Sequence, residues 1–104
     1  MAYKIIWSLQ ARDDLREIVS FIAADNPAVA ESFGLQLMTR TDSLANFPQL
    51  GRVVPEQSDE NTREIILRLY RIIYQVLSAQ KVVAIALIWH GARGEPEISS
   101  RLET

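Results

Sequence analysis

The chain has 104 residues, of which 48% are apolar and 23% charged, and its formal net charge is −2. This length fits one domain with one modest core, and this composition is that of an ordinary globular protein, which argues against disorder. A net acidic chain is a poor general binder of nucleic acid, because such binding depends on cations that neutralise phosphates. A local basic patch remains possible, since the second half contains Arg52, Arg63, Arg68, Arg71 and Arg93.

The absence of cysteine excludes disulfides, thiolate metal sites and a cysteine nucleophile, and it fits the cytoplasm. The first residues lack a basic region followed by an apolar stretch, so we expect no secretory signal. The longest apolar run, residues 82–89, is far shorter than the roughly 20 residues that a membrane-spanning helix needs. A single histidine leaves no metal-ligand spacing. We therefore expect a cytoplasmic protein without membrane contact, metal or cofactor.

The first half of the chain predicts a strand followed by two helices. Residues 3–7 are apolar and β-branched, as is typical of a strand, and apolar residues then recur at helical spacing over residues 9–24. Ser8 is placed to cap this first helix, and Asn26 to cap a second helix over residues 27–46. The expected buried stripe of the second helix is Ala30, Phe33, Leu37, Thr41 and Leu44.

The second half predicts four strands, at residues 52–54, 63–67, 69–77 and 82–89. The last of these is apolar at both parities, which is typical of a central strand covered on both faces. Two helices joined by so short a turn should form an antiparallel hairpin. The order β-α-α-β-β-β-β indicates an α+β domain, in which the hairpin packs on a mainly antiparallel sheet. We assign residues 1–93 to this single domain and residues 94–104 to a polar tail.

Arginines and tyrosines alternate with Ile and Leu over residues 63–74. Because successive side chains of a strand lie on opposite faces, one face can join the core while the other presents guanidinium and aromatic groups. Guanidinium groups bind carboxylates and phosphates, so this segment is either a recognition surface or a polar structural strand. In the structural interpretation, Arg71 and Glu64 form a cross-strand pair worth about a few tenths of a kcal/mol. Tyr70 and Tyr74 would then be core or rim residues.

A set of short motifs extends over nearly the whole chain. Its members are Ala11, Asp14-Leu15, Ile18 and Phe21-Ile22, then Asn26-Pro27, Ala30, Leu44, Phe47-Pro48, Gly51-Arg52, Arg63, Tyr70-Arg71-Ile72-Ile73-Tyr74 and His90-Gly91-Ala92-Arg93. In this order and spacing the set resembles the RelE/ParE superfamily of bacterial toxins from type II toxin–antitoxin modules. The resemblance is closer to the ParE-like, plasmid stabilisation members than to RelE itself.

The resemblance implies a RelE/ParE-like fold and a growth-inhibiting toxin that a cognate antitoxin neutralises. ParE-like members are understood to poison DNA gyrase, whereas RelE-like members cut mRNA in the ribosomal A site. We therefore expect a ParE-like toxin that binds and inhibits DNA gyrase and that forms a dimer, or a heterotetramer with its antitoxin. The residues predicted to bind the target or the antitoxin are Arg52, Glu56, Tyr70, Tyr74 and Arg93.

The alternative function is ribosome-dependent mRNA cleavage, with Arg63, Arg71 and His90 as the catalytic residues. Cleaving RNA without a metal needs a base, an acid and cations for the phosphate charge. Against this alternative, Gly91 replaces the aromatic residue that such nucleases carry after the histidine, and the loop at residues 55–62 is acidic rather than lysine-rich. A third interpretation is a non-toxic remnant that functions in a DNA-binding repressor complex with the antitoxin.

Overall fold

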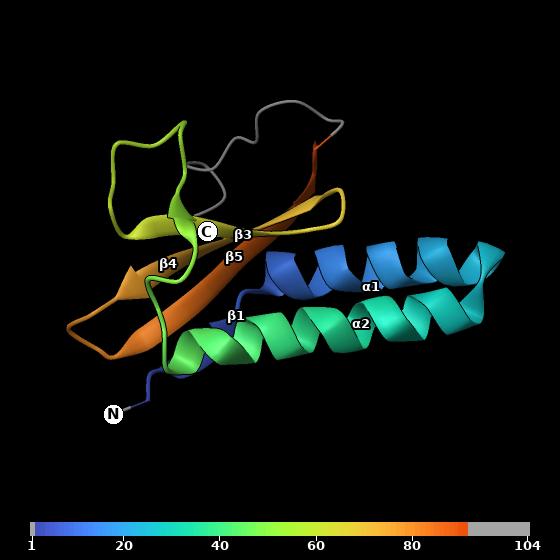
Figure 1. Cartoon of the computed structure of the whole chain (residues 1–104), viewed down its shortest axis with the longest axis horizontal. Helices are drawn as coiled ribbons and strands as arrows, with labels where there is room; N and C mark the ends of the chain where they lie inside the picture. The colour runs from blue at the N-terminus through green and yellow to red at the C-terminus, as the bar shows by residue number, and fades with distance from the viewer. Residues whose placement is uncertain (1, 92–104) are drawn as a thin grey trace.

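The computed structural model describes residues 2–91, in which a helical hairpin packs on a five-stranded sheet (Figure 1). Arg93 and the predicted tail lie outside the described residues. In chain order the elements are β1 (Lys4–Trp7), α1 (Leu9–Asp25), α2 (Pro27–Asp42), the 3-10 turn η1 (Ser43–Ala45), β2 (Arg52–Val53), β3 (Thr62–Leu67), β4 (Tyr70–Leu77) and β5 (Val82–His90). The predicted α+β order is confirmed.

The sheet has the strand order β1-β5-β4-β3-β2. The pairs β2–β3, β3–β4 and β4–β5 are antiparallel. The pair β1–β5 is parallel, from Lys4 opposite Val82 to Trp7 opposite Ile85. The predicted mainly antiparallel sheet is therefore confirmed. The predicted central position of the apolar strand is also confirmed, because β5 lies between β1 and β4.

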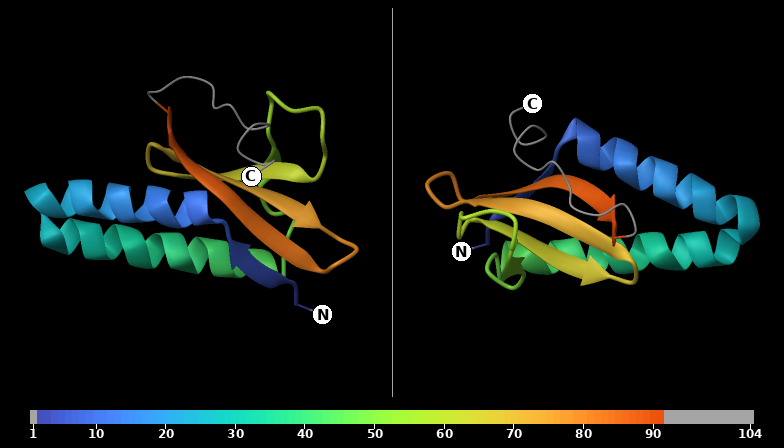
Figure 2. Two further views of the ribbon diagram at one scale, coloured as in Figure 1. Left: turned by 180° about the vertical axis from the view of Figure 1, so that it is seen from behind. Right: turned by 90° about the horizontal axis from the view of Figure 1, so that it is seen from above.

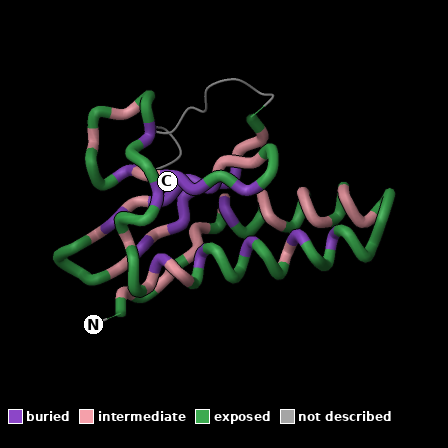
Figure 3. The backbone as a smooth tube through the Cα atoms, in the orientation of Figure 1, coloured by how far each residue is buried: buried purple, intermediate pink, exposed green. Residues whose placement is uncertain are grey.

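The two helices cover one face of the sheet, and the tip of their hairpin extends beyond it (Figures 1 and 2). Buried positions follow the strands and recur along one side of α2 (Figure 3). Within residues 2–91, neither helix is long and apolar enough to cross a membrane. The larger core lies between the helices and the sheet, and its buried members are Ala11, Phe33, Leu37, Leu44, Ile65, Leu67, Ile72, Tyr74, Val76, Val83, Ile85 and Ile88.

A smaller cluster is made by Val54, Ile73 and Leu87, with Trp89 packed against it. Ile73 follows the core residue Ile72 along β4, so its side chain lies on the sheet face opposite the helices. We call this the outer face of the sheet.

The predicted helix caps are both present. The Ser8 hydroxyl accepts a hydrogen bond from the backbone N–H of Ala11 at 3.0 Å, and the Asn26 side chain accepts one from Val29 at 3.2 Å. Pro27 occupies the first turn of α2, where a missing N–H leaves no intrahelical bond unmade. These caps place the hairpin turn between Asp25 and Pro27, as the sequence predicts.

The predicted end of the second helix, at residue 46, is wrong, because the α-helix ends at Asp42 and tightens into η1. Here the hydroxyls of Thr39, Thr41 and Ser43 donate to backbone carbonyls three or four residues earlier, which competes with regular helix bonding. The carbonyl of Ala45 instead accepts the backbone N–H of Tyr3 at 2.7 Å. The 3-10 turn is thus fastened to the start of the sheet.

Beyond the end of β1, side chains of α1 and its N-cap residue form hydrogen bonds with the backbone of β5. The Ser8 hydroxyl donates to the carbonyl of Ala86 at 2.7 Å, and the Asp14 carboxylate accepts the backbone N–H of Ile88 at 2.9 Å. These two bonds satisfy backbone groups of β5 that β1 is too short to reach. They also fix the position of α1 against the end of β5.

Candidate functional site

Four charged side chains form a continuous chain of ion pairs at the outer face, and we call it the ionic chain. Glu64 lies at its centre on β3, with a side chain that is 0% exposed. One Glu64 oxygen accepts from Nε of Arg52 and the other from Nε of Arg71, each at 2.5 Å. The other edge of the Arg71 guanidinium donates to both oxygens of Glu56, at 2.9 and 2.8 Å.

Strand register explains why these residues meet. Arg52 on β2 lies directly opposite Glu64 on β3, whereas Arg71 on β4 lies opposite Ile66. Arg71 therefore reaches Glu64 diagonally across the strand pair, a separation that long side chains can span. The predicted contact between Arg71 and Glu64 is confirmed.

The ionic chain favours the charged forms of Glu56 and Arg71. The hydrogen bonds from Arg71 hold the pKa of Glu56 below its usual range, and the carboxylates of Glu56 and Glu64 raise the pKa of Arg71. Because Arg71 donates to two carboxylates, its guanidinium stays charged at every accessible pH and has both edges occupied. Arg52 is more open, since its side chain is 61% exposed.

Arg63 and Tyr74 lie on the helix-covered face of the sheet, where they form hydrogen bonds with the loop that precedes β2. Tyr74 donates its hydroxyl proton to the carbonyl of Pro48 at 2.8 Å and accepts the backbone N–H of Gly51 at 2.9 Å. Arg63 donates from Nη1 to the Gly51 carbonyl at 2.9 Å. Tyr74, which the sequence predicts to contact a target or antitoxin, is instead fully buried in the core, and burial raises the pKa of its hydroxyl.

His90 and Tyr70 face each other at the far end of the helix-covered face. They are opposite in register, and their rings pack edge to face with centroids 5.0 Å apart. Together with α1 residues that include Glu17 and Phe21, they line a groove of about 830 Å³. The Phe21 side chain is prominently exposed at 76%. The lining of the groove thus combines aromatic rings with charged side chains of both signs, since Arg16 lies beside Asp14 and Glu17.

The three residues predicted for mRNA cleavage are not brought together. Arg71 lies on the outer face, whereas Arg63 and His90 lie on the helix-covered face. Arg63 is opposite Tyr74 and His90 is opposite Tyr70, so about four strand positions, roughly 13 Å, separate them along β4. Within residues 2–91, no group of three His, Asp or Glu side chains is placed to hold a metal ion.

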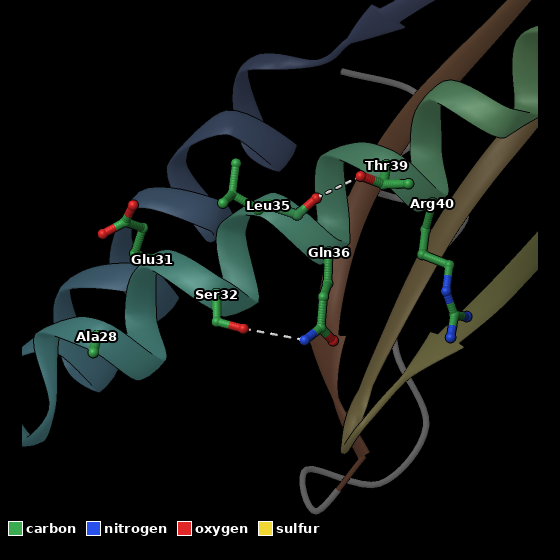
Figure 4. Close-up of a pocket in the computed structure, with 7 residues that line it drawn as sticks. All are labelled: Ala28, Glu31, Ser32, Leu35, Gln36, Thr39 and Arg40. Atoms are coloured by element: carbon green, nitrogen blue, oxygen red, sulfur yellow. Dashed lines mark hydrogen bonds between the residues drawn. The ribbon is translucent and has the colours of Figure 1, made fainter.

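A second surface depression lies along the solvent side of α2 (Figure 4). Its floor includes Leu35, which is 63% exposed, and Gln36, whose amide donates to the Ser32 hydroxyl. At its end Arg40 reaches across to the carbonyl of Ile66 on β3 at 3.3 Å. Sequence reasoning did not single out this surface, because isolated apolar residues on a helix are common and carry no motif.

A comparison with known protein families identifies the class of protein. The family model described as the ParE toxin of the type II toxin–antitoxin system, parDE, matches residues 5–94. The protein is thus a toxin of the type II toxin–antitoxin class. More narrowly, the chain belongs to the ParE toxin family within the RelE/ParE superfamily, which confirms the resemblance seen in the sequence.

One curated relative is similar in sequence, and two solved structures are similar in fold. The toxin RelE2 of Caulobacter vibrioides is 33% identical over 90 residues, which cover 86% of this chain and 97% of that protein. In the chromosomal ParDE system of P. aeruginosa, a chain of 17% identity superposes with a TM-score of 0.68, covering 86% of this chain and 96% of that one. A chain of the intact E. coli RelBE toxin–antitoxin complex, at 20% identity, gives 0.62 and covers 86% and 98%.

Proposed function

We propose that this toxin inhibits growth by binding DNA gyrase rather than by cutting RNA, and that a cognate antitoxin neutralises it. The match of a ParE toxin model to residues 5–94 supports a ParE-like target. The assembly expected for the pair is a dimer or a toxin–antitoxin heterotetramer, and the RelE relative from E. coli has been solved in complex with its antitoxin RelB.

One observation carries the preference for binding over catalysis. A nuclease needs its acid, base and phosphate-binding cations around one scissile bond. In residues 2–91, the candidates Arg63, Arg71 and His90 are divided between two faces of the sheet. The guanidinium of Arg71 is also held by two carboxylates in the free chain, so a phosphate would first have to displace Glu56.

Residues suited to protein contact lie on accessible surfaces. Arg52 is mostly exposed. Glu56 belongs to the ionic chain on the outer face, and Tyr70 lines the groove beside α1. We propose that these three residues contribute to target or antitoxin contacts. Arg93, proposed for the same role, lies outside the described residues.

Ribosome-dependent mRNA cleavage is the second candidate function. The observation that favours it is the 33% identity to a toxin named RelE2 over nearly its whole length. Under this alternative the catalytic residues would have to meet on the ribosome in an arrangement that the free chain lacks.

Two assays with the purified protein separate the candidates. In a supercoiling assay with gyrase and ATP, the proposal expects loss of supercoiling and accumulation of cleaved gyrase–DNA complexes. In a ribosome assay with a defined mRNA, it expects no codon-positioned cuts. Cuts without any effect on gyrase would reject the proposal in favour of the nuclease. No effect in either assay, with the antitoxin still bound, would indicate the non-toxic remnant.

A further inference from the structure

Two carboxylates hold Arg71, and they differ in how firmly they are fixed. Glu64 extends from β3, is completely buried and is also held by Arg52. Glu56 lies in the loop between β2 and β3, and its side chain is 19% exposed. The Arg71 edge that faces Glu56 is thus the accessible edge of the guanidinium.

The loop that carries Glu56 is closed at its base. The backbone N–H of Val54 donates to the carbonyl of Thr62 at 3.0 Å, and the N–H of Thr62 donates to the carbonyl of Asp59 at 3.1 Å. The Asp59 side chain also accepts from Asn61 at 2.9 Å. The carboxylate of Glu56 can therefore leave Arg71 without breaking a strand pairing or these closing bonds.

We propose that the outer edge of Arg71 is a binding site for an acidic side chain of a protein partner, and that Glu56 occupies this site in the free chain. The occupant already present indicates the ligand chemistry, because the Glu56 carboxylate fits the guanidinium in the two-bond arrangement that arginine prefers. Displacing Glu56 would expose the same two donors, Nη1 and Nη2, to a carboxylate from outside.

The surroundings favour an acidic peptide over a nucleic acid. The ionic chain has two cations and two anions, so displacing Glu56 leaves a net charge of one positive unit, enough for one carboxylate. Asp59 and Glu60 in the same loop would repel the many charges of a polyphosphate more strongly than the single charge of one carboxylate. Beside Arg71, the partly exposed Trp89 packs on the apolar cluster of the outer face. An acidic residue flanked by apolar residues matches this combination.

Occupation by Glu56 weakens the site for any competitor. A ligand binds only the fraction of molecules in which Glu56 has left, so its apparent dissociation constant rises as that fraction falls. A Glu56→Gln variant keeps the shape of the side chain but loses the charge that competes. We expect it to bind an acidic peptide about five to ten times more tightly than the unmodified chain.

The test is a titration followed by NMR at the Nε–H groups of Arg71 and Arg52. The probe is the capped tripeptide acetyl-Leu-Glu-Leu-amide, and acetyl-Leu-Gln-Leu-amide and inorganic phosphate are the comparison ligands. The matched control is Glu60→Gln, which removes the same charge from the same loop without freeing Arg71. The double variant Glu56→Gln/Arg71→Met tests whether Arg71 is the site.

The proposal expects saturable shifts with the Glu peptide at the lowest concentration in Glu56→Gln. It expects weaker binding in the unmodified chain and in Glu60→Gln, and none in the double variant. Equal affinity of the Glu peptide for Glu56→Gln and Glu60→Gln would mean that only the net charge of the loop matters, and it would overturn the proposal. So would the absence of saturable binding to Glu56→Gln, or tighter binding of phosphate or of the Gln peptide.

The site depends only on the geometry of this chain, and the role of its partner, as antitoxin or target, rests on the proposed function. The tripeptide titration involves neither gyrase nor an antitoxin nor toxicity. Failure of this test therefore leaves the gyrase proposal standing, and failure of the gyrase assay leaves this site standing.

Discussion

Glu64 on β3 and Glu56 in the loop following β2 both bind Arg71. The ion pair between Glu56 and Arg71 makes the stability of the fold depend on pH. Because the hydrogen bonds from Arg71 lower the folded pKa of Glu56 below its ordinary value of 4.5, folding favours the ionised carboxylate. The stabilisation is therefore fully present above about pH 4.5 and is lost as the pH falls through the lower folded pKa.

We predict that Glu56→Gln lowers the free energy of unfolding by up to about 1 kcal/mol at pH 7 and has almost no effect near pH 3. Urea denaturation at a series of pH values measures both variants. The control Glu60→Gln should show a smaller and flatter difference. A Glu56→Gln difference that persists unchanged at pH 3 would mean that the carboxylate charge is not its source.

Tyr74 is the second residue whose polar group has a structural role. Its hydroxyl bridges the Pro48 carbonyl and the Gly51 N–H inside the protein. We predict that Tyr74→Phe lowers the free energy of unfolding by about 1–3 kcal/mol, because the buried N–H of Gly51 and the partly buried carbonyl of Pro48 both lose a partner. Tyr3→Phe removes the same atom from a half-buried ring of the same core and should cost less. Equal midpoints in thermal denaturation for both variants would contradict this role.

At the scale of elements, two glycines in different surroundings offer a matched pair of substitutions. A Cβ at Gly51 would clash with the backbone carbonyl oxygen of Glu64 and lie 2.7 Å from the Tyr74 hydroxyl, whereas a Cβ at Gly34 in α2 meets nothing within 4 Å. We predict that Gly51→Ala destabilises the chain by more than about 2 kcal/mol, because β2 must move away from β3. Gly34→Ala should stabilise it by about 0.5–1 kcal/mol through helix propensity.

The same chemical denaturation series measures both glycine variants. The two substitutions add the same methyl group, so opposite signs isolate the effect of local space. A Gly51→Ala chain as stable as the unmodified one would show that β2 and its following loop can shift freely. In that case the close approach of Gly51 to β3 would not be a requirement of the fold.

The elements whose signals are local were predictable from sequence. Capping residues fixed the starts of α1 and α2, and the apolar run at residues 82–89 fixed the central strand. The end of α2 was not predictable, because the hydrogen bond from Tyr3 to Ala45 joins segments far apart in the chain. Local propensity carries no information about such a contact.

The contact between Arg71 and Glu64 was predictable from the sequence, whereas the division of the site residues between the two faces of the sheet was not. The face on which an arginine lies depends on the turn between β3 and β4, and a shift by one residue exchanges the faces. The sequence predicts a strand over residues 69–77, whereas β4 begins at Tyr70, which pairs with Leu67 across Arg68 and Leu69. Arg68 adopts a φ of 55°, a left-handed conformation that nothing in its residue type predicts.

At the scale of the whole molecule, the sheet separates two chemically different surfaces. The outer face carries the ionic chain, and the helix-covered face ends in the groove beside α1 that contains Tyr70 and His90. A binding protein can use both surfaces for different contacts, whereas a nuclease must gather its groups at one point. The division of the molecule into two faces is thus the broadest structural argument for binding.

His90 is where these two functions make opposite predictions. Its ring packs edge to face on Tyr70, so replacing it should remove a modest contact of about 0.5–1.5 kcal/mol and leave the fold intact. If the toxin acts by binding gyrase, a His90→Ala chain expressed from an inducible promoter should still inhibit growth and induce filamentation. If the histidine acts in proton transfer, mRNA cleavage should fall about 10²–10⁴-fold and growth should recover. Colony counts after induction, with primer extension on a host mRNA, measure both outcomes. The matched variant His90→Phe keeps a ring against Tyr70 and removes only the groups that can transfer a proton. Loss of toxicity in both His90→Ala and His90→Phe, with both chains folded by circular dichroism, would reject the gyrase-binding function in favour of catalysis.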